Sequence, residues 1–243
     1  MVSTVSGARL PVATGVVRAA LKTGALVRLS QVSKQFGDEV ALRGAGLRVR
    51  PGELVGVVGA RGAGKTVLAS VAAALLPPDE GEVRLFGRDP WEDCGLARSG
   101  VGLVPDRVPV ADRLSCFDVL VCCALRSGAA RGEAEREAGV LLAACELGDV
   151  AHVQAAACST GQQLLLRLAA AMLGGRALLV LDDPFDGVDG WESEVVRAVL
   201  REFAAAGGGV LCTARDRVAV QDWCDTHLAL RSGSLSPAPW AFR

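Results

Sequence analysis

The amino-acid sequence predicts an α/β fold with a parallel central sheet, a smaller antiparallel β region and a helical insertion. Three observations lead to this prediction. Apolar runs rich in Val and Leu alternate with helical segments, as in sheets that are buried on both faces. Several short strands surround a single glycine-rich loop, and the block over residues 111–157 has a helical pattern.

The composition fits one α/β domain with an insertion. The chain has 243 residues, 51% of them hydrophobic, and no Tyr, so we expect a large aliphatic core. The net charge of -1 gives no general electrostatic basis for binding nucleic acid, and we expect no such partner. The 8 cysteines form no CxxC pair and lie mostly in apolar runs, which is typical of a reducing, cytosolic compartment.

Residues 1–24 are small, apolar and weakly basic. Pro11, Gly15 and scattered basic residues interrupt the apolar segment that a signal peptide needs. We therefore expect a poorly ordered extension or a mis-assigned start, followed by one domain over residues 25–243. No uncharged apolar run approaches the roughly 20 residues that cross a bilayer, so if the protein works at a membrane another chain must span it.

An antiparallel sheet is predicted in the first part of this domain. Short strands are expected over residues 25–29, 40–43 and 46–50, with a turn at residues 37–38. Another short strand is expected over residues 82–87. Strands this short and this close in sequence favour an antiparallel sheet that packs beside the α/β core.

A phosphate-binding loop is the most specific motif. A Val-rich strand over residues 53–58 leads into it, and a helix over residues 67–76 follows it. Glycine N–H groups and the helix N-terminus favour a phosphate chain, Lys65 adds a full positive charge, and the Thr66 hydroxyl suits Mg²⁺. The alternative, a glycine-rich turn with a surface lysine, does not explain both flanks. The loop consists of Gly59, Ala60, Arg61, Gly62, Ala63, Gly64, Lys65 and Thr66.

An acidic pair ends a central strand. Residues 101–105 and residues 177–181 are apolar runs that read as strands, and Asp182 and Asp183 follow the second run. The carboxyl ends of parallel strands border the crevice where α/β sheets bind ligands, so we expect both acids there. The other elements expected in this half are helices over residues 163–173 and 191–205, a strand over 209–213, a short helix near 218–223 and a strand over 227–230.

The order of these motifs resembles the ATP-binding subunit of ABC transporters, over roughly residues 25–235. An aromatic loop, the phosphate loop, a helical region, a Ser-x-Gly-Gln segment, a strand ending in acids and a D-loop follow one another. The resemblance implies the ABC ATPase fold, a P-loop NTPase core with an antiparallel β subdomain and an inserted helical subdomain, here about residues 107–160. It also implies ATP and Mg²⁺ as ligands.

The resemblance assigns roles around the phosphate loop. Phe36 matches the aromatic residue that stacks on adenine, with ordinary core packing as the alternative. Asp182 matches the carboxylate that holds Mg²⁺ together with Thr66, with capping of the next turn as the alternative. Asp106 stands where the family has a glutamine, and its carboxylate also suits Mg²⁺.

A second set of residues is expected to face another protomer. Ser159, Gly161 and Gln162 match the family signature, which contacts the γ-phosphate of the ATP on the other protomer. Ser159 or Thr160 also suits a plain helix N-cap, which is compatible with that role. Asp189 matches the characteristic acid of the D-loop. Two subunits would thereby enclose two nucleotides.

The catalytic positions depart from the family pattern. Asp183 replaces the glutamate that serves as general base and is one methylene shorter. Asp106 replaces an amide, and Ala214 stands at the position assigned to the switch histidine. Arg215 is adjacent, but the sequence does not show that it points inward, and Val67 replaces a hydroxyl residue. We therefore expect slow or impaired hydrolysis.

These features predict an ABC-type nucleotide-binding subunit. We expect it to bind MgATP and to couple ATP-driven dimerisation to transport by a separate transmembrane permease, from a cytoplasmic position on the inner face of the cell membrane. The second ATP-binding subunit is a copy of the chain or a different partner, and the weakened site favours a heteromer. The compact length and the Val104-Pro105-acid segment resemble two-component exporters. The alternatives are a non-transport ABC-type module acting on soluble partners and a phosphate-loop kinase, which the Ser159 signature disfavours.

Overall fold

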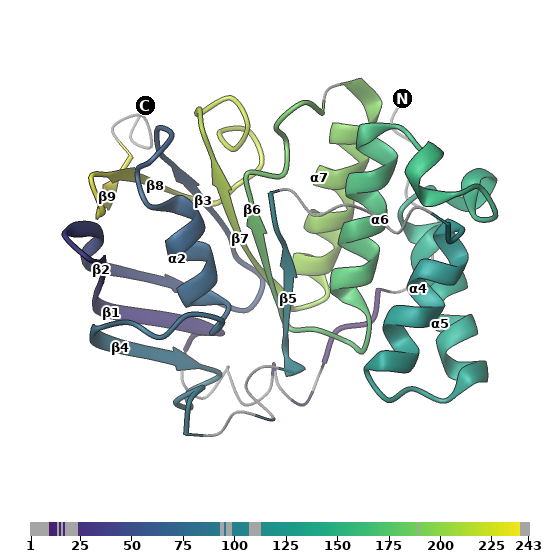
Figure 1. Ribbon diagram of the computed structural model, residues 1–243, viewed down its shortest axis with the longest axis horizontal. Coiled ribbons are helices and arrows are strands. Elements are labelled where there is room, and N and C mark those ends of the chain that lie inside the picture. Colours follow the sequence, from purple (N-terminus) through teal and green to yellow (C-terminus); the bar gives the residue numbers. More distant parts are fainter. Residues whose placement is uncertain are drawn as a thin grey trace.

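The fold consists of a small sheet, a larger sheet beside it and a group of helices beyond (Figure 1). The computed structural model describes residues 10–13, 15, 17, 24–92, 95, 99–106, 113–188 and 190–238. Within them, the mixed α/β architecture confirms the predicted fold class, with an antiparallel region before the parallel core.

The small sheet is three-stranded and antiparallel, in the order β2-β1-β4. Leu29 lies opposite Leu47 on one side and Val83 on the other, and all three side chains are buried. Alternation of side chains along the strands thus gives the sheet one apolar face. Its strands are β1 (Val27–Phe36), β2 (Glu39–Val49) and β4 (Glu80–Leu85).

The larger sheet has six strands in the order β5-β6-β7-β3-β8-β9. Its strands are β3 (Leu54–Val58), β5 (Val101–Val104), β6 (Leu178–Asp182), β7 (Gly209–Ala214), β8 (Thr226–Arg231) and β9 (Ser234–Pro237). All pairs are parallel except β8–β9. Every residue of β3, β6 and β7 is buried, which explains their continuous apolar sequences. The carboxyl ends of these three strands meet at one edge of the sheet.

Helices cover both faces of the larger sheet (Figure 1). Leu179 and Leu181 of β6 belong to one apolar cluster with residues of α6 and α7. Leu178 and Val180 point the other way and pack with residues of α2 and β1. Side chains of β6 therefore reach two separate cores. The helices are α2 (Lys65–Ala72), α4 (Cys116–Arg126), α5 (Arg131–Ala144), α6 (Thr160–Met172) and α7 (Gly190–Ala205), with 3-10 turns η1 (Gly148–Val150) and η2 (Ala155–Ala157).

α6 lies directly against the edge strand β5, and α4 and α5 pack beyond it. A Cβ atom at Gly102 would lie 2.0 Å from the carbonyl oxygen of Ala171. Only glycine lets the backbones of helix and strand approach so closely. The elements α4, α5, η1 and η2 correspond to the predicted helical insertion, and residues 107–112 at its predicted start lie outside the described part.

Several predicted elements differ from the structure. α2 ends at Ala72 instead of residue 76, because Ala74 has a positive φ of 55° and the N–H groups of Leu75 and Leu76 both turn back to Ser70 O. The short helix predicted near residues 218–223 is a series of turns. β9 was not predicted, since its few residues carry almost no apolar pattern.

The described part of the N-terminal extension packs on the domain. Leu10 is buried in the cluster that α6 and α7 share, and the Ala13 N–H donates to Arg176 O at 3.4 Å. Within residues 10–13 an apolar side chain thus packs in the core, and the predicted poor order of residues 1–24 stays a prediction. Of the helices in the described residues, none has both the length and the hydropathy needed to cross a membrane.

Candidate functional site

The phosphate loop begins where β3 ends and closes tightly before α2. A Cβ at Gly64 would lie 2.3 Å from Ala41 O, and the φ of Gly64 is 102°, so this position requires glycine. Gly64 is also the N-cap of α2 and has no capping side chain. The N–H groups in the first turn of α2 have no acceptor within the helix, and this end of the helix favours an anion.

Lys65 spans the loop from inside. Its side chain is only 8% exposed, and Nζ donates to Gly59 O at 2.7 Å and to Ala60 O at 3.1 Å. A lysine ammonium has three donors, so these carbonyls leave one for a ligand. The phosphate loop thus holds the lysine side chain in place through two hydrogen bonds, and Lys65 lines a cavity beside the loop.

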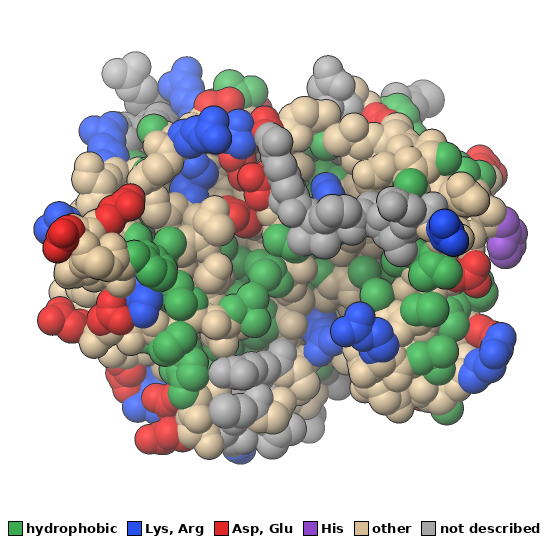
Figure 2. Space-filling view, in the orientation of Figure 1, with side chains coloured by type: hydrophobic (Ala, Val, Ile, Leu, Met, Phe, Trp, Pro, Cys, Tyr) green, Lys and Arg blue, Asp and Glu red, His purple; other side chains and the backbone are tan. Residues whose placement is uncertain are grey.

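This cavity of about 630 Å³ joins Phe36 and part of the phosphate loop with the acids Asp106, Asp182 and Asp183. A volume of about 300–1,000 Å³ is usual for a small-ligand site. Figure 2 shows Lys and Arg side chains beside Asp and Glu side chains at the top of the molecule. The cavity is lined by Phe36, Glu39, Ala41, Arg61, Gly62, Gly64, Lys65, Thr66, Val67, Asp106, Asp182, Asp183 and Arg215. Gly59, Ala60 and Ala63 line an adjoining pocket behind the loop.

Asp182 is held rigidly at the end of β6. It is 3% exposed, and its Oδ1 accepts a hydrogen bond from Thr213 Oγ1 of β7 at 2.8 Å. Thr66 lines the same cavity. The described residues contain no cluster of three or more His, Cys, Asp or Glu that would hold a metal alone. Mg²⁺ normally takes one or two protein oxygens together with phosphate and water, so Thr66 and Asp182 fit that ion when a phosphate is bound.

Asp183 is engaged in an ion pair. Its Oδ2 lies 2.6 Å from Nε of Arg215, and the same guanidinium lies 2.9 Å from Asp186 Oδ2. Burial raises the pKa of the Asp183 carboxyl, while the positive charges of Arg215 and Lys65 act in the opposite direction. Asp183 also has a positive φ of 48°, which its N–H contacts to Thr213 help to hold.

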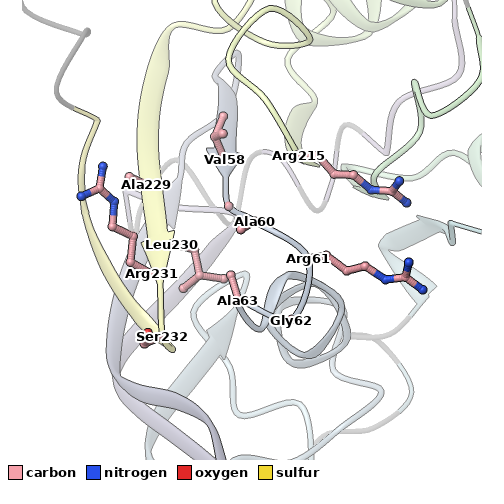
Figure 3. A pocket seen from close by; sticks show the side chains of 11 residues that line it. Val58, Ala60, Arg61, Gly62, Ala63, Arg215, Ala229, Leu230, Arg231 and Ser232 are labelled. Atoms are coloured by element: carbon pink, nitrogen blue, oxygen red, sulfur yellow. The ribbon is translucent and has the colours of Figure 1, made fainter.

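Arg215 directly follows β7, and its side chain lines the cavity. Ala214 is 1% exposed inside β7, its carbonyl accepts the Gly59 N–H at 3.0 Å, and it does not line the cavity. Figure 3 shows Arg61 and Arg215 extending to the same side of the phosphate loop, with Arg231 pointing away. Sequence reasoning centred on Ala214 and left the direction of Arg215 open. Alternation along the strand was the available signal, since neighbouring side chains point to opposite faces.

Phe36 is exposed, so the core-packing alternative is wrong for it. The ring is 49% exposed at the margin of the cavity, and Lys34 Nζ lies 5.6 Å from its centroid. An aromatic face left open to solvent beside a phosphate loop is available for stacking on a base.

The signature residues lie apart from the cavity. Ser159 is the N-cap of α6: its Oγ accepts from Gln162 N at 3.0 Å, and its own N–H donates to Gln162 Oε1 at 3.0 Å, forming a capping box. Neither Ser159, Gly161 nor Gln162 lines the cavity that contains Lys65. Asp189 lies outside the described residues.

A strand, a glycine loop closed by a buried lysine, and a strand-end carboxylate in one cavity define a P-loop nucleotide-binding protein. The family model described as "ABC transporter" matches residues 42–186. The chain belongs to the ABC transporter family. It is 34% identical over 203 residues to a putative ABC transporter ATP-binding protein of Halobacterium salinarum, covering 83% of this chain and 88% of that one.

Another relative is an export protein. The chain is 30% identical over 212 residues to Nod factor export ATP-binding protein I of Sinorhizobium fredii, covering 87% of this chain but 62% of the relative's length. Among solved structures, one described as the ATP binding subunit of an ABC transporter has a TM-score of 0.76 at 22% identity, covering 87% of this chain and 90% of that one. This likeness supports the ABC ATPase fold.

Proposed function

We propose that the chain binds MgATP as the nucleotide-binding subunit of a transporter and hydrolyses it slowly. The observation that carries this proposal is the single cavity that joins Lys65, Thr66 and Asp182 with the exposed ring of Phe36. In this arrangement the loop and Lys65 bind the phosphates, Thr66 and Asp182 hold Mg²⁺, and Phe36 stacks on the adenine.

The proposed slow turnover rests on Asp183. A general base needs a free carboxylate lone pair directed at the attacking water, but one Asp183 oxygen lies 2.6 Å from Arg215 Nε. Correct placement of a general base contributes a factor of about 10²–10⁴ to the rate of hydrolysis, and the ion pair removes a large part of this factor. Asp106 and the buried Ala214 supply neither the expected amide nor a histidine. Asp106 lines the same cavity, its negative charge acts on Asp183, and its carboxylate is of the kind that suits Mg²⁺.

The proposed partners are a transmembrane permease and a second ATP-binding subunit. Two relatives are named for Nod factor export and macrolide export, which supports an export system and a place on the cytoplasmic side of the membrane. The Ser159 end of α6 lies outside this chain's own cavity, which supports a role opposite another protomer's nucleotide.

A nucleotide titration tests the proposal. A fluorescent ATP analogue should bind the purified chain in the presence of Mg²⁺, and Lys65→Ala should abolish binding while the chain stays folded. Turnover should be slow in the same preparation. Fast hydrolysis that Lys65→Ala abolishes would contradict the proposed impairment, and unchanged binding by Lys65→Ala would contradict the site itself.

A further inference from the structure

The signature end of α6 is covered by a side chain of the same protein. Ser159 Oγ donates to Glu192 Oε1 at 3.2 Å. A Cβ placed on Gly161 would lie 2.5 Å from Glu192 Cβ and 2.6 Å from its Cγ. The Glu192 side chain therefore packs against the Cα side of Gly161, which is buried although it lies in the first turn of the helix. α6 and α7 lie side by side, so this contact joins two neighbouring helices (Figure 1).

The only proton of the Ser159 hydroxyl is used by these contacts. The hydroxyl accepts the Gln162 N–H at 3.0 Å and has one proton, which it gives to Glu192. A phosphate oxygen that approached Ser159 would need the same proton. The carboxylate and the phosphate are both anions, so they exclude each other electrostatically as well as by space.

The negative charge of the Glu192 carboxylate lies near the positive N-terminal end of α6, which is a favourable interaction. α6 spans Thr160–Met172 and has no acidic residue of its own in its first turn. The partial positive charge at its N-terminus is therefore met by Glu192 from α7. The Glu192 carboxylate therefore competes with a phosphate for the Ser159 hydroxyl at this helix end.

We propose that Glu192 blocks the signature in the unpartnered chain, and that the terminal phosphate of a nucleotide carried by a second copy of the chain must displace it. This inference rests on the proposed function, because it takes the α6 end as the surface that meets the other protomer's nucleotide. The displacement needs a rotation of the outer Glu192 side chain that breaks the hydrogen bond to Ser159, while Glu192 Cβ stays against Gly161. Glu192 is half-buried, and Trp191 beside it is 51% exposed, so nothing in the described chain encloses this corner.

Dimerisation with nucleotide tests the block. Glu192→Gln keeps the size of the side chain and a hydrogen-bond acceptor but removes the charge, and Glu192→Ala removes the whole contact. Glu194→Gln is the matched control, because this carboxylate on the same helix pairs with Arg197 at 2.6 Å instead of covering α6. Sedimentation velocity with a slowly hydrolysed ATP analogue and Mg²⁺ measures the protein concentration at half dimerisation.

We expect this concentration to fall about tenfold in Glu192→Gln and further in Glu192→Ala, because a hydrogen bond to a charged group no longer has to be broken. Glu194→Gln should match the parent chain. Adding Ser159→Ala to Glu192→Gln should cancel the gain, since the phosphate then lacks the hydroxyl donor.

Two outcomes would overturn the inference while the analogue still binds. Either the Glu192 variants dimerise no better than Glu194→Gln, even if their melting temperatures fall, or the gain persists without Ser159. The first would make Glu192 a plain link between α6 and α7. Absence of nucleotide binding to the single chain would instead refute the proposed function, and the binding titration shows this separately.

Discussion

Replacing Thr213 with Val tests how firmly Asp182 is held. Thr213 Oγ1 donates to Asp182 Oδ1 at 2.8 Å, and the two residues are 0% and 3% exposed. Valine keeps the shape of the side chain but removes the hydroxyl, so the largely buried Asp182 carboxylate loses its hydrogen-bond donor. The Asp183 N–H keeps an acceptor, because Thr213 O lies 3.1 Å from it.

The expected cost is substantial. A buried acceptor left unsatisfied costs about 1–3 kcal/mol, with charged groups toward the upper end, so we expect the free energy of unfolding to fall by about 2–3 kcal/mol. In a chain of this size each kcal/mol lowers the melting temperature by roughly 2–4 °C, which gives a fall of about 4–12 °C. Thr213→Ser retains the hydroxyl and loses one methyl, so it should cost only about 1 kcal/mol.

Thermal unfolding followed by circular dichroism, without nucleotide, measures both variants. If Thr213→Val is as stable as Thr213→Ser, the hydroxyl does not support Asp182 and the reasoning fails. Saturating MgATP should restore part of the lost stability, because Mg²⁺ gives the Asp182 carboxylate a new partner.

Three further changes probe the cavity. Arg215→Gln removes the charge that holds down the pKa of Asp183, so the acid limb of the pH–rate profile should move to higher pH; an unmoved limb contradicts the ion pair. In the same variant, the free energy of unfolding should fall more than in the parent chain as the pH rises through the folded-state pKa of Asp183. Burial already raises that pKa above its unfolded value, and the loss of Arg215 raises it further. Phe36→Ala should weaken ATP binding about tenfold in calorimetric titration, the scale of base–aromatic stacking, and leave the melting temperature unchanged. Gly64→Ala should destabilise the fold by about 1–3 kcal/mol and abolish nucleotide binding, since its φ is 102°; Gly132→Ala, in open space on α5, is the control.

The fold was predictable where local chemistry decides the structure. The phosphate loop needs its strand, its glycines and its helix in one continuous stretch; β3 lies where the sequence placed it, and α2 follows the loop as predicted but ends four residues earlier. The fully buried β6 likewise appears in the sequence as an unbroken apolar run ending in Asp182. The membership of the ABC transporter family, inferred from the order of the motifs, is confirmed by the family match over residues 42–186.

Contacts between distant segments were not predictable from the sequence. Arg215 reaches Asp183 only because β6 and β7 are neighbours in the sheet, and these two strands are far apart in the sequence. Glu192 covers Gly161 because α6 and α7 pack together, although no local pattern connects the two residues. Leu10 fills a site in a core built mostly from residues far along the chain. Such placements follow from packing and not from propensity or motif.

The close approach of α6 to β5 places the C-terminal end of this helix in direct contact with the strand. Gly102 admits the carbonyl of Ala171 near one end of α6, and Ser159 caps the other end. A helix of this length spans about 20 Å and does not bend easily, so a tilt imposed at Ser159 moves the opposite end against the strand. β5 leads directly to Asp106 in the cavity. Ser159 and Asp106 are therefore connected through one helix and one strand whose backbones meet at Gly102 and Ala171.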